Sequence, residues 1–166
     1  FAERTQPDAA APDPDDVGER FLRSLRFTPI SFELIDQARS EVGKKNGAEA
    51  VRLLKRREVS PLELINAAAA RIESTNPKIN ALVTLCYDRA RDHARRIMSD
   101  RRPDPPAQYL HGLPIAVKDG TDVAGVRCTS GSRIYADRIA PASDVVVQRL
   151  EANGAVVIGK SNLPEF

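Results

Sequence analysis

Near its carboxyl end the chain combines a helical segment with an almost continuous run of apolar, β-branched residues. Residues 144–152 have helical spacing, Gly154 suits a left-handed helix end, and residues 155–158 read Ala-Val-Val-Ile. A strand that is apolar at successive positions is typical of a parallel sheet covered by helices on both faces. This pair predicts half of a βαβ unit and places the chain in the α/β class.

A second apolar run, residues 114–118, ends in Lys118. Turn residues precede it and β-forming residues fill it, which favours a buried strand. We expect the ammonium of Lys118 to be carried toward the interior, where burial favours an uncharged amine. An uncharged amine can act as a general base. The alternative is a lysine that reaches solvent or pairs with Asp119.

The composition limits the classes of partner. Of the 166 residues, 42% are hydrophobic and 29% are charged, and 25 basic against 23 acidic side chains give a net charge of +2. So balanced a charge does not favour nucleic acid or an anionic membrane as a partner. No apolar stretch approaches the length of a membrane span. The chain is long enough to bury one core of ordinary size.

The chain divides into three regions. Residues 1–20 are rich in Pro, Ala and Asp and predict an extended or flexible arm. Residues 21–106 predict a helical region with one strand, beginning with helices over 31–43 and 50–58. Residues 107–166 contain both apolar runs and predict the first, incomplete part of the α/β core.

Within the helical region, a third helix has a distinct start. Ser60 and Glu63 form an S-x-x-E capping box before an apolar stripe. The Asn76-Pro77 dipeptide is expected to break this helix. A strand over 79–86 and a charged helix over 88–99 follow.

In the core, a short strand is expected at 126–128, and Ser143 is expected to cap the helix over 144–152. Cys86 and Cys128 lack the spacing of metal ligands, which leaves two buried thiols or a disulfide. The histidines at 93 and 111 are isolated in sequence, so we expect structural or surface roles for them.

Four segments together resemble the opening part of the core of the amidase signature family. They are the Gly-Leu-Pro-Ile-Ala-Val-Lys-Asp segment at 112–119, the Thr-Ser-Gly-Ser turn at 129–132, a helix that opens on Ser143-Asp144, and Gly-Ala-Val-Val-Ile-Gly-Lys-Ser-Asn at 154–162 leading to Pro-Glu-Phe at 164–166. The resemblance covers roughly Ser60 to the end. It implies the N-terminal part of an α/β/α sandwich with a mixed central sheet, preceded by helices.

The resemblance also implies hydrolysis of a carboxylic amide by a Ser–cis-Ser–Lys triad, without metal or organic cofactor, and Lys118 matches the triad lysine. The family carries both serines on a later glycine- and serine-rich loop, and no such loop occurs in these 166 residues. Residues expected only to support the catalytic centre from outside are Thr129, Ser130, Ser132, Ser161 and Asn162. Covalent hydrolysis needs a nucleophile, a base and an oxyanion site together. We therefore expect an N-terminal portion of a longer amidase that is inactive and incompletely folded alone.

Other functions stay open. Within the family, the alternative is an amidotransferase-type subunit; outside it, the alternative is a non-catalytic, truncated homologue that binds a partner. The expected partners are a small-molecule or peptide amide and the remainder of the same enzyme, with a homodimer left open and neither nucleic acid nor membrane expected. The compartment is unknown; we expect a soluble protein and favour the cytoplasm, with export followed by removal of a leader as the alternative.

Overall fold

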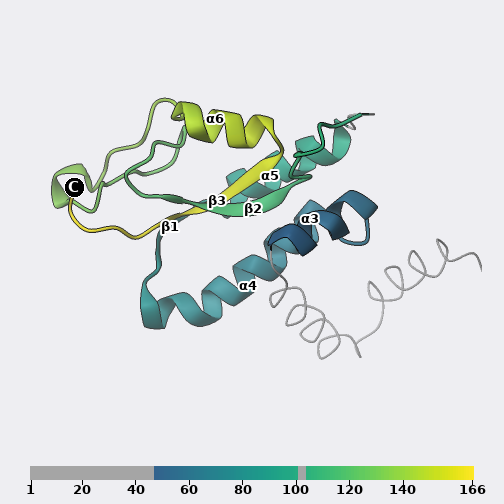
Figure 1. Cartoon of the computed structure of the whole chain (residues 1–166). Coiled ribbons are helices and arrows are strands. Elements are labelled where there is room, and N and C mark those ends of the chain that lie inside the picture. The colour runs from purple at the N-terminus through teal and green to yellow at the C-terminus, as the bar shows by residue number, and fades with distance from the viewer. Residues whose placement is uncertain (1–46, 101–103) are drawn as a thin grey trace, which may run out of the picture. The chain divides into compact units, whose positions relative to one another are not determined.

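The structure is a computed structural model that describes residues 47–100 and 104–166. The predicted arm over 1–20 and the helix over 31–43 lie outside the described residues. The elements in chain order are α3 (Gly47–Arg56), α4 (Pro61–Ile79), β1 (Leu82–Leu85), α5 (Tyr87–Ser99), β2 (Leu113–Lys118), the 3₁₀ helix η1 (Arg133–Tyr135), α6 (Val145–Ala152) and β3 (Ala155–Ser161) (Figure 1).

The three strands form one mixed sheet with β3 in the centre. The order is β1-β3-β2, with β1 antiparallel and β2 parallel to β3. In the parallel pair, Leu113 lies opposite Ala155 and Lys118 opposite Ser161, with one irregularity after Ile115. The α/β class and the mixed sheet predicted from the sequence are confirmed.

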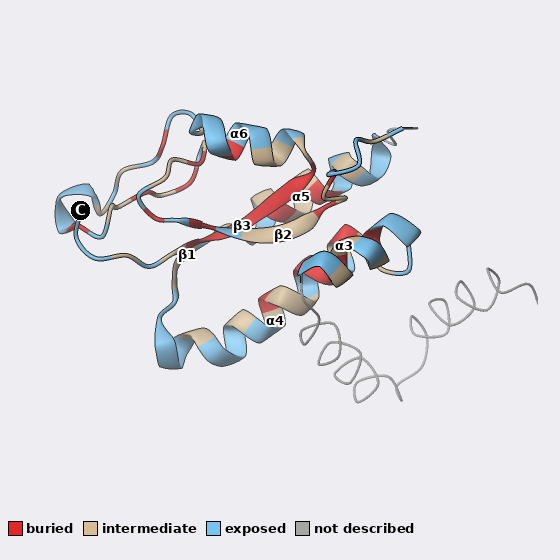
Figure 2. Ribbon diagram, viewed as in Figure 1, coloured by how far each residue is buried: buried red, intermediate tan, exposed pale blue. Residues whose placement is uncertain are grey.

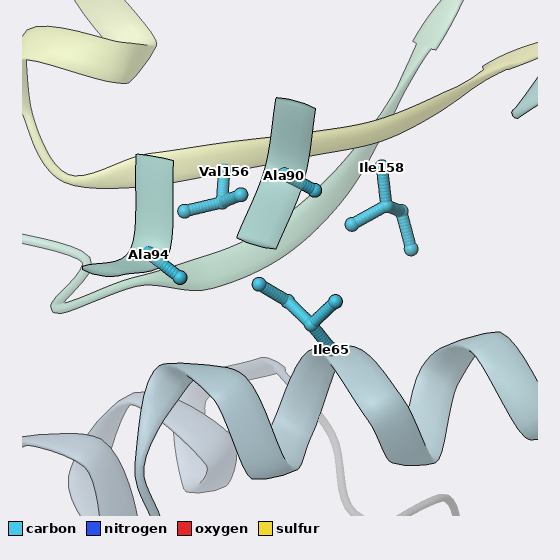
Figure 3. Close-up of a cluster of buried hydrophobic side chains, with 5 residues drawn as sticks. All are labelled: Ile65, Ala90, Ala94, Val156 and Ile158. Carbon is cyan, nitrogen blue, oxygen red and sulfur yellow. The ribbon is translucent and has the colours of Figure 1, made fainter. Parts of the chain in front are cut away.

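The central strand is covered on both faces, and all of Ala155 to Lys160 is buried (Figure 2). On one face, α4 and α5 pack on β3 through a cluster that Figure 3 shows. Its members are Ile65, Ala90, Ala94, Val156 and Ile158. On the other face, Val157 packs with Val147 of α6. Burial on both faces explains why β3 is apolar at successive positions.

The start of α4 forms as its sequence predicts, whereas its end does not. The Ser60 hydroxyl accepts a hydrogen bond from the Glu63 N–H at 3.2 Å, and the Glu63 carboxylate accepts one from the Ser60 N–H at 2.9 Å. The break expected at Asn76-Pro77 is wrong, because α4 continues to Ile79. Pro77 lacks the N–H for one helical hydrogen bond, but only two helical residues follow it, so little of the helix lies beyond the proline. The left-handed Asn80 then closes the helix with a 2.7 Å bond to the Asn76 carbonyl.

We expect Ser60→Ala to lower the free energy of unfolding by about 1 kcal/mol, because it removes one side of the capping box. Urea unfolding followed by circular dichroism measures the change. Ser74→Ala is a matched control, since Ser74 is exposed in the same helix and donates only to the Arg71 carbonyl. Equal losses from both variants would contradict the capping argument.

Three further boundaries differ from the sequence predictions. The strand expected over 79–86 is shorter, because α4 takes its first residue and only Leu82–Leu85 pairs with β3. The strand expected at 126–128 is an isolated bridge from Arg127 to Ile139. The cap of α6 is Asp144 rather than Ser143, whose hydroxyl accepts a 2.9 Å bond from the Ala124 N–H instead.

Candidate active site

Lys118 ends β2 at the edge of the sheet where the parallel strand β3 also ends. Ser161, the last residue of β3, lies opposite it. Open α/β sheets place ligands outside the carboxyl ends of their parallel strands. The expectation that the Lys118 ammonium points into the interior is wrong for the described residues, because Lys118 is exposed. Val117 and Asp119 on either side are buried, so the alternation of the strand turns Lys118 outward.

The residue after Lys118 is fixed through its backbone. The Asp119 N–H donates to the Ser161 carbonyl at 3.0 Å. The Asp119 carbonyl accepts from the Cys128 thiol at 2.6 Å and from Lys160 Nζ at 3.3 Å. The backbone of Asp119 is therefore bonded to β3 and to Cys128, which follows the isolated bridge at Arg127.

The side chain of Asp119 is also buried and bound. Its Oδ2 accepts from the Thr129 N–H at 3.1 Å and from the Thr129 hydroxyl. Its Oδ1 lies 3.6 Å from Lys160 Nζ. Asp119 and Lys160 both have 0% of their surface exposed. A buried charge is tolerated when it is paired, and these two charges pair with each other.

The Thr129–Ser132 segment forms a turn in which the hydroxyls of Thr129 and Ser132 bind backbone groups. Thr129 Oγ1 accepts from the Gly131 N–H at 3.2 Å, and Ser132 Oγ accepts from the Ile134 N–H at 3.3 Å. Gly131 has a φ of +68°, and a Cβ there would lie 2.7 Å from the Pro164 carbonyl oxygen. Glycine is therefore required for the last residues to pack on this turn.

The C-terminal residues hold the other side of the turn. Ser132, which is buried, donates to Glu165 Oε1 at 2.6 Å, and the Ser130 carbonyl accepts from the Phe166 N–H at 3.0 Å. Asn162 lies apart from this turn, because its amide donates to the Asn80 carbonyl at 3.2 Å. The structure thus brings Thr129 and Ser161 to the backbone beside Lys118, while Ser130 and Ser132 bind the C-terminal residues.

Sequence reasoning missed Asp119 and Lys160 as members of this site. Both stand in the segments that carry the family resemblance, next to Lys118 and Ser161. Strand β3 was expected to end at Ile158, which would have left Lys160 in a turn. The structure extends β3 to Ser161 and buries Lys160.

A family model described as Amidase matches residues 63–166. The chain belongs to the amidase family. This is a family of hydrolases that act on C–N bonds, and its solved members share the α/β fold described above.

An individual relative from the curated proteins matches about two thirds of this chain. The chain is 42% identical over 108 residues to a glutamyl-tRNA(Gln) amidotransferase subunit from Anaeromyxobacter dehalogenans (strain 2CP-C); the match covers 65% of this chain and 22% of that protein. The chain spans less than a quarter of that relative's length.

Two solved structures are similar in fold to this chain. An amidase family protein from Bacillus anthracis str. Ames superposes with a TM-score of 0.70 at 25% identity, covering 89% of this chain and 30% of that one. A vestigial protein complex linked to the origins of an s-triazine catabolic enzyme superposes with a TM-score of 0.67 at 35% identity, covering 73% and 27%.

Both cysteines of this amidase chain are free thiols, so the disulfide left open by the sequence is not formed. Cys128 is buried and Cys86 is half-buried. Burial raises the pKa of both thiols. Cys128 acts as a hydrogen-bond donor to the Asp119 carbonyl and thus belongs to the structure around Lys118.

The histidines of the amidase chain contact other side chains. His93 Nδ1 lies 3.6 Å from Glu151, and the His111 ring lies edge-on to Tyr109 with centroids 5.0 Å apart. Over residues 47–100 and 104–166, no three His, Cys, Asp or Glu side chains are placed to hold a metal ion. Among these same residues, no helix is long and apolar enough to cross a membrane.

The loop after Asp119 is fixed by an ion pair. Arg138 binds both oxygens of Asp122 at 2.6 Å, and the hydrogen bond from Arg138 lowers the pKa of Asp122 to about 2. The Asp122 N–H donates to Asp144 Oδ2 at 2.8 Å, which joins the loop to the start of α6.

We expect the Asp122–Arg138 pair to stabilise the fold above about pH 4 and to lose this effect as the pH falls through about 2. Stability falls with falling pH because the pKa of Asp122 is lower in the folded state than in the unfolded state, so protonation of Asp122 favours unfolding. Thermal unfolding of wild type and Asp122→Asn between about pH 5 and about pH 2 measures how the stabilisation by this pair depends on pH. The difference in midpoint should be largest at the upper end and shrink toward the lower end; a constant difference would contradict the assignment.

Proposed function

We propose that the protein containing this chain hydrolyses the C–N bond of a carboxylic amide and that Lys118 is its proton acceptor. The observation that carries the proposal is the position of Lys118. It is exposed at the carboxyl end of β2, while the backbone that carries it is fixed by buried neighbours. A general base must be reachable by the group that gives up the proton and must be held in place relative to it.

The proposed reaction uses two serines on the family's glycine- and serine-rich loop, which would lie beyond these residues. The Lys118 amine accepts the proton of a bridging serine, and that serine accepts the proton of a second serine. The second serine attacks the amide carbonyl and forms an ester as the C–N bond breaks. The amine or ammonia leaves with a proton, and water then hydrolyses the ester and releases the acid.

A second candidate within the family is an amidotransferase subunit. The 42% identity to the glutamyl-tRNA(Gln) amidotransferase relative favours it. In that role, the same lysine would take part in releasing ammonia from an amide donor, and the ammonia would pass to a charged tRNA held with partner subunits. The two candidates share the chemistry at Lys118 and differ in where the ammonia goes.

Ammonia release by the purified whole protein separates these candidates. The intact mass, measured under denaturing conditions, first shows whether a longer chain or a second polypeptide accompanies residues 1–166. The substrates are glutamine, short aliphatic amides, aryl amides and peptide amides, each with and without glutamyl-tRNA. Release from simple amides alone supports the amidase, and release from glutamine that depends on tRNA supports the amidotransferase. A folded whole protein that releases no ammonia under any condition would favour a non-catalytic, partner-binding homologue instead.

A further inference from the structure

A second lysine lies buried behind Lys118, and the proposed proton transfer does not use it. Lys160 and Asp119 are both fully buried at the ends of neighbouring strands. A buried ion pair seldom stabilises a fold more than well-packed apolar side chains of the same volume would. Its presence beside an exposed lysine therefore calls for a role other than stability alone.

The contacts of Lys160 converge on the residue that follows Lys118. Lys160 Nζ donates to the Asp119 carbonyl at 3.3 Å and lies 3.6 Å from Asp119 Oδ1. The Cys128 thiol donates to the same carbonyl, and the Ser161 carbonyl holds the Asp119 N–H. The peptide groups on both sides of Asp119 are thus fixed by side chains and backbone from separate segments.

Lys118 itself is held by the peptide group that it shares with Asp119. Its carbonyl accepts from the Thr121 N–H at 2.9 Å, and its strand neighbour Val117 lies opposite Lys160 in the parallel register. The backbone of Lys118 is therefore fixed while its side chain is exposed. An amine on a flexible four-carbon stem depends on such an anchor for its position.

We propose that Lys160 is a positioning residue for Lys118, acting through the carbonyl and carboxylate of Asp119. This inference rests on the proposed role of Lys118 as proton acceptor. Removal of the Lys160 ammonium leaves the Asp119 carboxylate buried without its countercharge, and Asp119 Oδ1 already has no hydrogen-bond donor among the described residues. The end of β2 then shifts, and the Lys118 amine moves with it.

The test is steady-state kinetics on the whole protein. In Lys160→Met, kcat should fall about 100-fold, with KM within roughly threefold of wild type, because a displacement of about 1 Å suffices for such a loss. In Lys160→Met/Asp119→Asn, no buried charge is left unpaired, so the thermal midpoint should recover while kcat stays low. Lys78→Met removes an exposed lysine from the last turn of α4 and should leave kcat unchanged.

A readout apart from turnover is the rate at which an amine-reactive reagent modifies Lys118, followed by peptide mass spectrometry. This rate should change in both Lys160 variants and stay at the wild-type value in Lys78→Met. If the double variant recovers kcat together with its midpoint, or if Lys118 reacts as in wild type, Lys160 has only a structural role and the proposal is overturned.

Cys128→Ala decides the question if the Lys160 variants do not fold. It removes the second side-chain donor to the Asp119 carbonyl without unpairing a charge. The folded variant should lose kcat on the order of 10-fold at similar KM, and an unchanged kcat would overturn the proposal. A separate variant tests the role of Lys118 as proton acceptor. If Lys118→Ala retains turnover, the proposed function itself is wrong, whatever the Lys160 variants show.

Discussion

Lys118→Ala is expected to abolish amide hydrolysis by the whole protein and to leave its fold intact. Among the described residues the side chain is exposed, so its removal leaves no cavity and no unpaired buried group in this part of the protein. Loss of a general base lowers the rate by roughly two to four decades, and a base that works with two serines as a unit should reach or exceed the upper figure. The measurement is kcat/KM, with circular dichroism and the thermal midpoint as checks on folding.

Lys118→Arg separates the loss of a base from the loss of a positive charge. The guanidinium remains protonated at working pH and cannot accept a proton, so this variant should be as inactive as the alanine variant. Lys55→Ala, an exposed lysine in the last turn of α3, is the matched control and should keep full activity. A folded Lys118 variant that keeps most of its turnover would rule out the proposed role.

Ile65→Ala should give the largest loss of stability among single substitutions in the described core. Ile65 has 0% of its surface exposed and fills the space between α4, α5 and β3 (Figure 3). Truncation of a buried isoleucine removes its burial and leaves a cavity, which together lower the free energy of unfolding by about 2–5 kcal/mol. Because Ala90 and Ala94 on the facing helix are already small, they cannot fill this cavity by changing rotamer.

Ile79→Ala is the control for this prediction. It makes the same change in the same helix at a residue that is 67% exposed. Its effect on the free energy of unfolding should lie within about 0.5 kcal/mol of zero. Urea unfolding of both variants and wild type measures the two effects, and losses of similar size would show that the α4–α5–β3 cluster does not hold the fold as described.

The elements of the fold could be predicted where local patterns agree with tertiary packing. The apolar run at 155–158 predicted a strand buried on both faces, and the Ser60–Glu63 capping box predicted the start of α4. Predictions were wrong where tertiary contacts override local preference. The Asn76 amide, expected next to a helix break, instead binds the backbone N–H and C=O of Leu82 at 2.8 Å and links α4 to β1. Ser143 likewise binds the loop at Ala124 rather than its own helix.

In the candidate site, too, local patterns could be predicted from the sequence and tertiary contacts could not. Lys118 could be proposed from the order of the segments around it, because the pattern of residues is local. The sequence left open whether Lys118 is buried or reaches solvent, since that depends on what covers the end of the sheet. The pairing of Lys160 with Asp119 joins residues 41 positions apart, and no local pattern indicates which buried charge meets which. Recognising it needed the register of β2 on β3.

The order of the strands has a consequence for synthesis on the ribosome. Within the described residues, β1 and β2 each pair with β3 and not with each other, and β3 is the last of the three to be made. A nascent chain that stops before Ala155 therefore carries two strand segments with open edges and no described partner. Open strand edges and uncovered apolar faces promote aggregation. Emergence of Ala155–Ser161 thus sets the earliest moment at which this sheet can form.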